Sequence, residues 1–217
     1  MTPQDIISDV RQLLNDTSPT YRHSDTQLLV FVNQAIKRVS LLRPDLFTVY
    51  ADMVCTVNTV VQSAPADSIR LMEVLQVVDG DALYESERPI LDMHTPSWRT
   101  ATGGAARTWM RDPRSPNKFF IYPKAPASAQ SLTIQYAKTP IADYILSATI
   151  TELQETYRVS LVDCTIFLAQ SIDDEHVSAG RAKLFYESFT QGLGTALKVR
   201  EITDTESAGM KPNSGDR

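Results

Sequence analysis

The longest apolar pattern in the chain covers residues 153–197 and predicts two helices joined by an acidic turn. In the first helix, apolar residues recur every three or four positions without a helix breaker over residues 153–172. Thr151 and Gln154 have the spacing of a capping box, so we expect this helix to begin within a turn of Thr151. The acidic run Asp173–Glu175 suits the positive end of the second helix dipole.

The second of these helices has a broad apolar face. It comprises Ala182, Phe185, Tyr186, Phe189, Leu193, Ala196 and Leu197. Gly180 lies near the start of this helix, and its missing side chain predicts a close approach of another backbone.

Two further helices are predicted near the N-terminus. Thr2–Asp5 supplies an N-cap, a proline at the first helical position and an acid in the first turn. Ser24 and Gln27 have capping-box spacing, and the helix that they begin runs to Pro44. With the C-terminal pair these make four helices, and apolar faces of this width must cover one another.

The apolar period changes to two between Phe47 and Lys138, which predicts a β region. The strand candidates are residues 49–57, 59–63, 69–78, 107–111, 118–122 and 132–137. They are short and closely spaced, which favours antiparallel pairing. A single helical turn is expected at Ile90–His94, before Pro96.

This order of elements predicts an α+β protein that is mainly α. We expect a four-helix bundle built from residues 1–46 and 150–197, interrupted by an inserted antiparallel β module over residues 47–149. Residues 198–217 are polar, and we expect a flexible C-terminal tail that orders on contact with a partner.

Composition and charge restrict the classes of function. Apolar residues make up 42% and charged residues 22% of the 217 positions, which is typical of a globular protein. The net charge is −5, and residues 150–197 hold seven acids against three bases. This acidic balance opposes binding through nucleic-acid phosphates. The chain has neither an apolar run of membrane-span length nor a signal-peptide pattern, so we predict no membrane association and synthesis in the cytosol.

The strongest hint of catalysis is an acidic cluster near the predicted helix turn. A metal-dependent hydrolase or nuclease would use Asp163, Asp174 and His176. However, consecutive acids point in different directions, and a helix start accounts for them without a metal. We therefore predict no catalytic, cofactor or metal site and no enzyme. His23 and His94 have no ligand-spaced partner and are expected on the surface or in turns.

Two other groups of residues can be explained by structural roles alone. Cys55 and Cys164 are predicted to be buried free thiols because both lie in apolar patterns. Residues 103–124 mix five bases with four aromatic residues, which would suit a nucleic-acid-binding regulator. Two strands with aromatics inward and arginines outward explain the same pattern.

Several stretches, in order along residues 2–197, together resemble one family. The C-terminal part consists of Tyr157, Ser160–Asp163, Asp174–His176, Ala179–Ala182, Tyr186, Phe189 and Leu193–Gly194. The preceding parts are Ser24–Asp25, Leu28–Leu29, Asn33–Ala35, Arg43–Asp45, Ala64–Asp67, Ile69–Leu71, Pro96–Trp98, Asp112–Pro113 and Phe119–Pro123. This collinear set is similar to the head-to-tail connector, or adaptor, proteins of tailed bacteriophages.

The resemblance implies a non-enzymatic virion protein of the neck, assembled in the bacterial cytoplasm. It implies a homo-oligomeric ring, usually of twelve copies, that docks under the portal protein, extends the DNA channel and gives tail or nozzle proteins a platform. Genomic DNA would pass without sequence-specific binding. In such adaptors a C-terminal extension commonly reaches the portal, so the expected partner contacts are Lys198, Arg200, Ile202, Met210 and Lys211.

Overall fold

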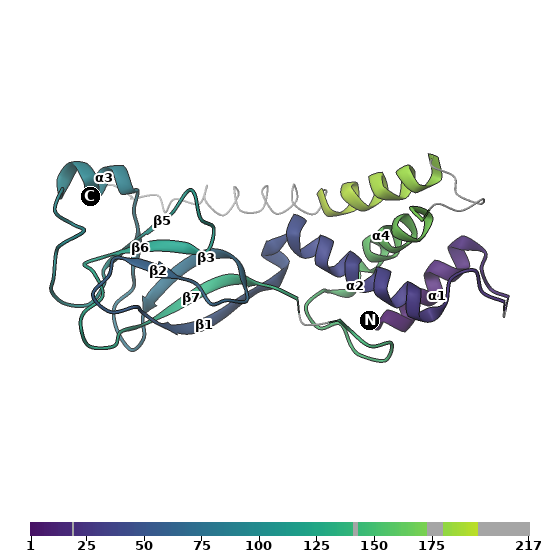
Figure 1. Cartoon of the computed structure of the whole chain (residues 1–217), viewed down its shortest axis with the longest axis horizontal. Coiled ribbons are helices and arrows are strands. Elements are labelled where there is room, and N and C mark those ends of the chain that lie inside the picture. The colour runs from purple at the N-terminus through teal and green to yellow at the C-terminus, as the bar shows by residue number, and fades with distance from the viewer. Residues whose placement is uncertain (19, 141–142, 173–179, 195–217) are drawn as a thin grey trace, which may run out of the picture. The chain divides into compact units, whose positions relative to one another are not determined.

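The computed structural model describes residues 1–18, 20–140, 143–172 and 180–194. This part of the chain divides into two compact units. One is the β unit, Val39–Pro140, and the other is the helical unit, formed by the residues before and after it. Figure 1 labels the elements along the chain.

The helical unit contains segments from both ends of the chain. They are α1 (Pro3–Leu14), most of α2 (Asp25–Leu42), the 3-10 turn η2 (Glu155–Tyr157), α4 (Arg158–Gln170) and a helical stretch over residues 180–194. Ile6, Ile7 and Val10 of α1 are fully buried, as are Leu28 and Val32 of α2. These residues form the apolar faces that the helical periodicity predicts.

The predicted starts of the first two helices are confirmed. The Thr2 hydroxyl accepts a hydrogen bond from the Asp5 backbone N–H at 3.2 Å, and the Thr2 N–H donates to the Asp5 carboxylate at 2.8 Å. Ser24 and Gln27 make the same reciprocal pair at 3.2 and 3.0 Å. Each pair satisfies two backbone donors that the helix leaves open.

The predicted start of α4 is wrong. The helix begins at Arg158 after η2, and no side chain caps it. The Thr151 hydroxyl donates to the Glu152 carboxylate instead. Residues 160–166 are all buried, so packing around the helix, and not a local cap, determines where it forms.

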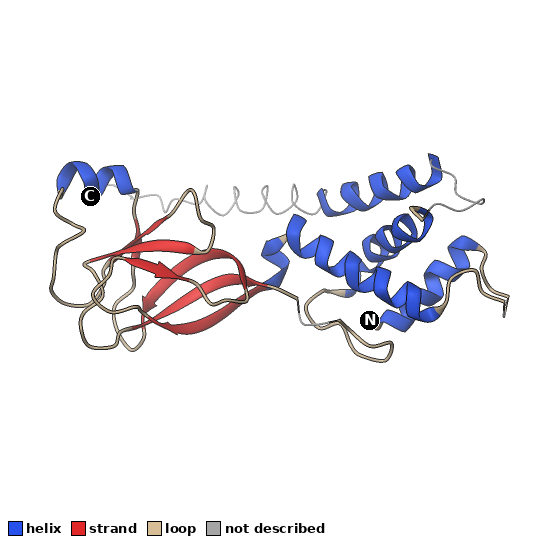
Figure 2. Ribbon diagram, in the orientation of Figure 1, coloured by secondary structure: helices blue, strands red, loops and turns tan. Residues whose placement is uncertain are grey.

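The β unit contains seven strands and two short helical elements among the described residues (Figure 2). The elements are η1 (Pro44–Phe47), β1 (Thr48–Val54), β2 (Val61–Ser63), β3 (Ser68–Val77), β4 (Tyr84–Glu85), α3 (Arg88–His94), β5 (Thr108–Arg111), β6 (Lys118–Tyr122) and β7 (Ser131–Lys138). One sheet has the order β1-β7-β3 and the other the order β2-β6-β5-β4. All pairs are antiparallel except β4 with β5, which is parallel.

Side chains from both sheets form one hydrophobic core in the β unit. Leu132, Ile134 and Tyr136 of β7 alternate inward and pack in the same cluster as Trp109 of β5 and Phe119 of β6. Each of these five side chains is at most 5% exposed. The β unit therefore has a core of its own.

The predicted fold class is wrong. The described chain has five α-helices, counting the stretch over residues 180–194, and two sheets; it is not a four-helix bundle with a small inserted module. The sequence pattern missed β4 and predicted only the part of α3 at Ile90–His94. The Trp98 indole N–H donates to the Asp92 carboxylate of α3 at 2.8 Å and so stabilises this helix. Counting helices gave too little weight to the strands, which bury enough apolar surface to form an independent core.

Candidate functional site: a groove between α1 and α4

A groove of about 420 Å³ lies between α1 and α4 in the helical unit. It is lined by Asp9, Gln12 and Leu13 of α1 and by Arg158, Val159, Val162 and Asp163 of α4. The two helices come from opposite ends of the sequence, so the groove depends on their tertiary packing. It combines an ion-pair network, a buried carboxylate and exposed apolar side chains.

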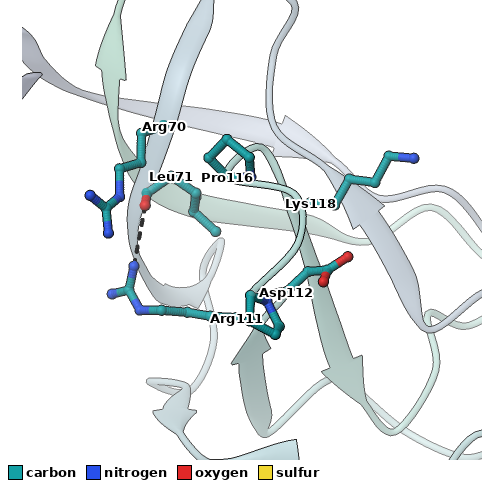
Figure 3. Close-up of a pocket in the computed structure, with 7 residues that line it drawn as sticks. Arg70, Leu71, Arg111, Asp112, Pro116 and Lys118 are labelled. Atoms are coloured by element: carbon teal, nitrogen blue, oxygen red, sulfur yellow. Dashed lines mark hydrogen bonds between the residues drawn. The ribbon is translucent and has the colours of Figure 1, made fainter. Parts of the chain in front are cut away.

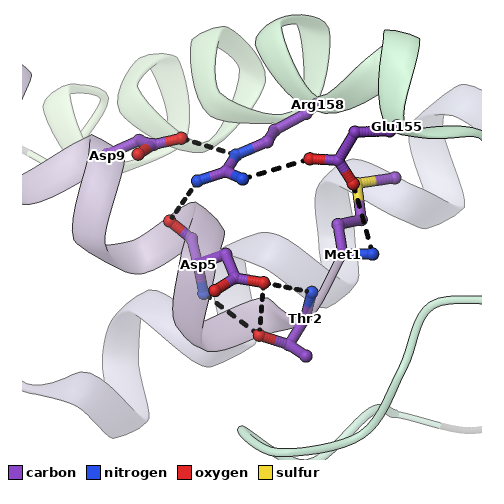
Figure 4. Close-up of polar contacts among 6 residues, drawn as sticks. All are labelled: Met1, Thr2, Asp5, Asp9, Glu155 and Arg158. Carbon is purple, nitrogen blue, oxygen red and sulfur yellow. Dashed lines mark hydrogen bonds and ion pairs between the residues drawn. The ribbon is translucent and has the colours of Figure 1, made fainter.

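Arg158 lies at the centre of the ion-pair network (Figure 4). Its guanidinium donates to the Asp9 carboxylate at 2.7 Å, to the Glu155 carboxylate at 3.1 Å and to the Asp5 backbone carbonyl at 3.4 Å. The N-terminal amino group of Met1 pairs with the other Glu155 oxygen at 3.2 Å. The network therefore ties the uncapped start of α4 to α1.

Hydrogen bonds in this region favour the charged forms of Arg158, Glu155 and Asp5. Hydrogen bonds to Asp9 and then to Glu155 raise the pKa of Arg158. The Arg158 hydrogen bond lowers the pKa of Glu155, and the Thr2 hydroxyl lowers the pKa of Asp5. These groups are thus fixed charges at neutral pH, and none is poised to exchange a proton there.

Asp163 lies at the buried side of the groove and is 7% exposed. The Ser188 hydroxyl donates to its Oδ2 at 2.6 Å. Burial raises the pKa of Asp163, and the Ser188 hydrogen bond opposes that rise only in part. Ser188 belongs to the helical stretch over residues 180–194, so this hydrogen bond joins that helix to α4.

Replacing Asp163 with Asn should stabilise the helical unit at neutral pH. The pKa of Asp163 is higher in the folded state than its ordinary value of 3.8. Asp163 therefore contributes most to stability below pH 3.8, and this contribution is lost as the pH rises through the folded-state pKa. Asparagine keeps an acceptor for Ser188 and cannot ionise. Urea unfolding followed by circular dichroism should show a higher midpoint for Asp163→Asn at neutral pH. A lower midpoint would show that the ionised carboxylate stabilises the fold.

The outer edge of the groove is apolar and open to solvent. Leu13 is 49% exposed and Val159 is 69% exposed. Val159 contrasts with residues 160–166, which are all buried. The groove therefore has two exposed apolar side chains at its edge, one from each helix.

The hydrolase hypothesis gains no support from the described residues. Asp163 is placed, and its side-chain hydrogen bond is to a serine. Asp173, Asp174, Glu175 and His176 lie outside the described residues. Among the residues that are placed, no three His, Cys, Asp or Glu side chains gather closely enough to hold a metal ion.

Both cysteines are buried free thiols, as predicted. Burial raises the pKa of Cys55 to about 11 and that of Cys164 to about 11, so neither forms a thiolate readily near neutral pH. The prediction for His94 is confirmed, because it is exposed at the end of α3. His23 lies in the bend before α2, as the turn alternative allows, but it is not on the surface: it is buried with its ring edge against Phe31.

The basic and aromatic residues of the 103–124 segment differ in their exposure to solvent. Trp109 and Phe119 are at most 1% exposed, whereas Arg107, Arg111 and Lys118 are exposed. Lys118 and Phe119 alternate as expected of a strand that covers a core. Arg107, Trp109 and Arg111 share one side of the β5 segment, and there the arginines are exposed because they lie at its two ends. The aromatic rings that a single-strand nucleic-acid surface would need are thus partly withdrawn from solvent.

The expected close approach at Gly180 is wrong. A side-chain carbon placed there would meet no atom of the described residues within 4 Å. The close contact is at Gly192, where such a carbon would lie 2.9 Å from the Ser160 hydroxyl oxygen of α4. The sequence gives no signal that separates these two glycines, because the difference depends on which turn faces α4.

The expected partner contacts Lys198, Arg200, Ile202, Met210 and Lys211 lie outside the described residues. The structure therefore does not place them relative to the groove. Sequence reasoning also missed the groove itself, although it singled out Asp163. The residues of α1 and α4 that line it are about 150 positions apart, and no local pattern connects them.

Comparison with known proteins assigns the chain to a family. A family model described as SU10 adaptor protein matches residues 1–214, nearly the full length. The chain belongs to this family, and the resemblance to phage head-to-tail adaptors is thereby confirmed. No match was found among curated proteins. Among the described helices, none combines the length and the apolar character needed to cross a bilayer.

Proposed function

We propose that this protein is a structural component of a phage virion that joins the head to the tail and catalyses no reaction. The match of the adaptor family over residues 1–214 carries this proposal. The fixed charges of the Arg158 network and the suppressed thiols agree with a role in assembly, since neither offers a reactive group.

The proposed place of the protein is the neck, in a ring under the portal protein. Twelve copies would surround the DNA channel, and tail or nozzle proteins would bind the ring. The net charge of −5 supports the passage of DNA through such a channel, because an acidic protein gains little from binding phosphates. The polar residues 198–217 remain the proposed portal contact.

We further propose that the groove between α1 and α4 contacts the neighbouring copy. A closed ring built from one kind of subunit needs two different, complementary surfaces on each subunit. The groove offers Leu13 and Val159 as one apolar surface, and α2 exposes Val30, which is 49% accessible, as a candidate for the other. Both surfaces belong to the helical unit.

Placing a charge at Val159 tests this contact. Val159→Asp should leave the fold unchanged, because the side chain is 69% exposed. It should weaken assembly by roughly tenfold or more, since a carboxylate would be buried in an apolar interface. The measurement is native mass spectrometry of the full chain mixed with its cognate portal protein.

Val54→Asp is the matched control, because Val54 of β1 is 67% exposed and undergoes the same change. This variant should assemble like the unaltered chain. The reverse pattern, with Val54→Asp defective and Val159→Asp normal, would place the contact in the β unit and contradict the proposed groove.

A further inference from the structure

A second concave site lies in the β unit, and three of its four charged lining residues are basic. The basic pocket, as we call it, has a volume of about 330 Å³ (Figure 3). It is lined by Arg70 and Leu71 of β3, Arg111 of β5, Lys118 of β6, and Asp112, Pro113 and Pro116 of the turn between β5 and β6. Three cations and one carboxylate thus surround a partly apolar cavity.

Arg111 is held rigidly at the wall of the basic pocket. Its guanidinium donates to the Leu71 carbonyl at 3.2 Å, to the Met72 carbonyl, and to the Glu85 carboxylate at 2.6 Å. It also lies over the Trp109 ring, 4.8 Å from the ring centre. These bonds use three of the five N–H groups of a guanidinium. A charge fixed in this way binds a ligand with little loss of side-chain entropy.

The other two cations of the basic pocket make no ion pair within the part of the chain that the structure describes. Arg70 and Lys118 are both exposed, and in Figure 3 Arg70 extends to the same side as Arg111 while Lys118 extends to the opposite side. Asp112 is the acid of the lining, and its Oδ1 accepts the Arg114 backbone N–H at 3.0 Å. The Glu85 carboxylate offsets part of the Arg111 charge. Arg70 and Lys118 therefore provide the uncompensated positive charge.

We propose that the basic pocket binds an acidic peptide segment of another protein chain. One carboxylate of the peptide would lie beside Arg70 and Arg111, because arginine offers paired donors that match its two oxygens. A second carboxylate would lie toward Lys118. An aliphatic neighbour in the same peptide would contact Leu71, Pro113 and Pro116. The apolar wall favours a peptide, since an aliphatic side chain can fill it and a phosphodiester backbone carries no such side chain. The net charge of −5 also opposes a nucleic-acid ligand.

This inference goes beyond the proposed adaptor function and does not depend on it. The basic pocket lies wholly within the β unit, whereas the proposed ring contact lies within the helical unit. Loss of peptide binding would leave the assembly prediction for Val159 unaffected. Likewise, normal assembly of Val159→Asp would leave the peptide-binding prediction unaffected.

The test is a nuclear magnetic resonance titration of the full-length, isotope-labelled chain. The probe is the peptide acetyl-Leu-Asp-Glu-Leu-amide, and its neutral counterpart is acetyl-Leu-Asn-Gln-Leu-amide. The acidic peptide should shift the backbone resonances of Arg70, Leu71 and Lys118, and added salt should weaken the effect. Arg70→Gln and Lys118→Gln should each weaken binding by roughly tenfold. Arg111 is left intact because it also braces the backbone of β3.

Arg107→Gln is the matched control, because Arg107 is an exposed arginine of the same unit that does not line the basic pocket. It should bind the acidic peptide like the unaltered chain. Equal binding of the neutral peptide, or an equal loss with Arg107→Gln, would overturn the proposal. So would tighter binding of a single-stranded oligothymidylate at the same residues, which would make the basic pocket a phosphate site. An absence of shifts up to about 10 mM acidic peptide would also overturn it.

Discussion

Phe119→Ala is expected to destabilise the β unit by about 3–5 kcal/mol. Phe119 of β6 is fully buried in the core that both sheets share. Its removal would leave a cavity that the neighbouring strands fill only in part, because side chains from opposite sheets hold them apart. A loss of this size is a large part of the stability of a typical domain.

Intrinsic fluorescence can follow this loss in the β unit alone. The chain has two tryptophans, Trp98 and Trp109, and both lie in the β unit. Urea unfolding monitored by tryptophan fluorescence should show a strongly lowered midpoint for Phe119→Ala. Phe120→Ala is the matched control, since Phe120 is only half-buried. Its ring makes an edge contact with the Trp98 ring, with 6.0 Å between the ring centres. It should cost about 1 kcal/mol. Equal losses of stability in both variants would contradict the alternation of buried and half-exposed side chains along β6.

Arg11→Met is expected to destabilise the helical unit by about 3–5 kcal/mol. The Arg11 guanidinium donates to Asp16 at 2.9 Å, to Asp25 at 2.6 Å and to the His23 carbonyl at 2.9 Å. Arg11 is 8% exposed, and the Asp16 side chain is 11% exposed. Loss of the guanidinium would leave the mostly buried Asp16 carboxylate without a cation, and that is the main cost.

Lys37→Met is the matched control for Arg11→Met. Lys37 pairs with Asp143 at 2.6 Å, the same separation as in the Arg11–Asp25 pair, but its side chain is 53% exposed and that of Asp143 is 66% exposed. Solvent screens such a pair, so its loss should cost at most about 1 kcal/mol. Far-ultraviolet circular dichroism during urea unfolding would measure both variants. A loss for Lys37→Met as large as that for Arg11→Met would show that burial does not set the difference.

Local signals in the sequence predicted elements well where a local cause determines them. The capping boxes at Thr2 and Ser24 and the stop at Pro44 lie where the sequence places them, because each involves residues within a few positions. The start of α4 could not be predicted in this way, since no cap defines it. Burial of residues 160–166 and the bonds of Arg158 to α1 hold it instead.

The fold class failed for a related reason. Periodicity and turn signals identified every described strand except β4 but contained no information about how the strands divide into two sheets. The two-residue strand β4 is too short to give a pattern, and its parallel pairing with β5 depends on the path of the chain between them. The size of the β core becomes evident only when side chains from both sheets are brought together.

The candidate sites were less predictable than the elements. The sequence pointed to Asp163 only as part of the acidic cluster of the hydrolase alternative, and it gave no signal for its partner Ser188. The basic pocket combines Arg70 with Arg111 and Lys118, which are more than 40 positions further along the chain. Charge counts over a segment cannot show which cations the fold leaves without an acid.

The most direct test of the adaptor assignment is a cryo-electron microscopy reconstruction of the neck of the virion that contains this protein. We predict a ring of this chain between the portal and the tail, with the groove between α1 and α4 covered by the neighbouring copy. A neck reconstruction in which no density fits either unit of this chain would contradict the central claim.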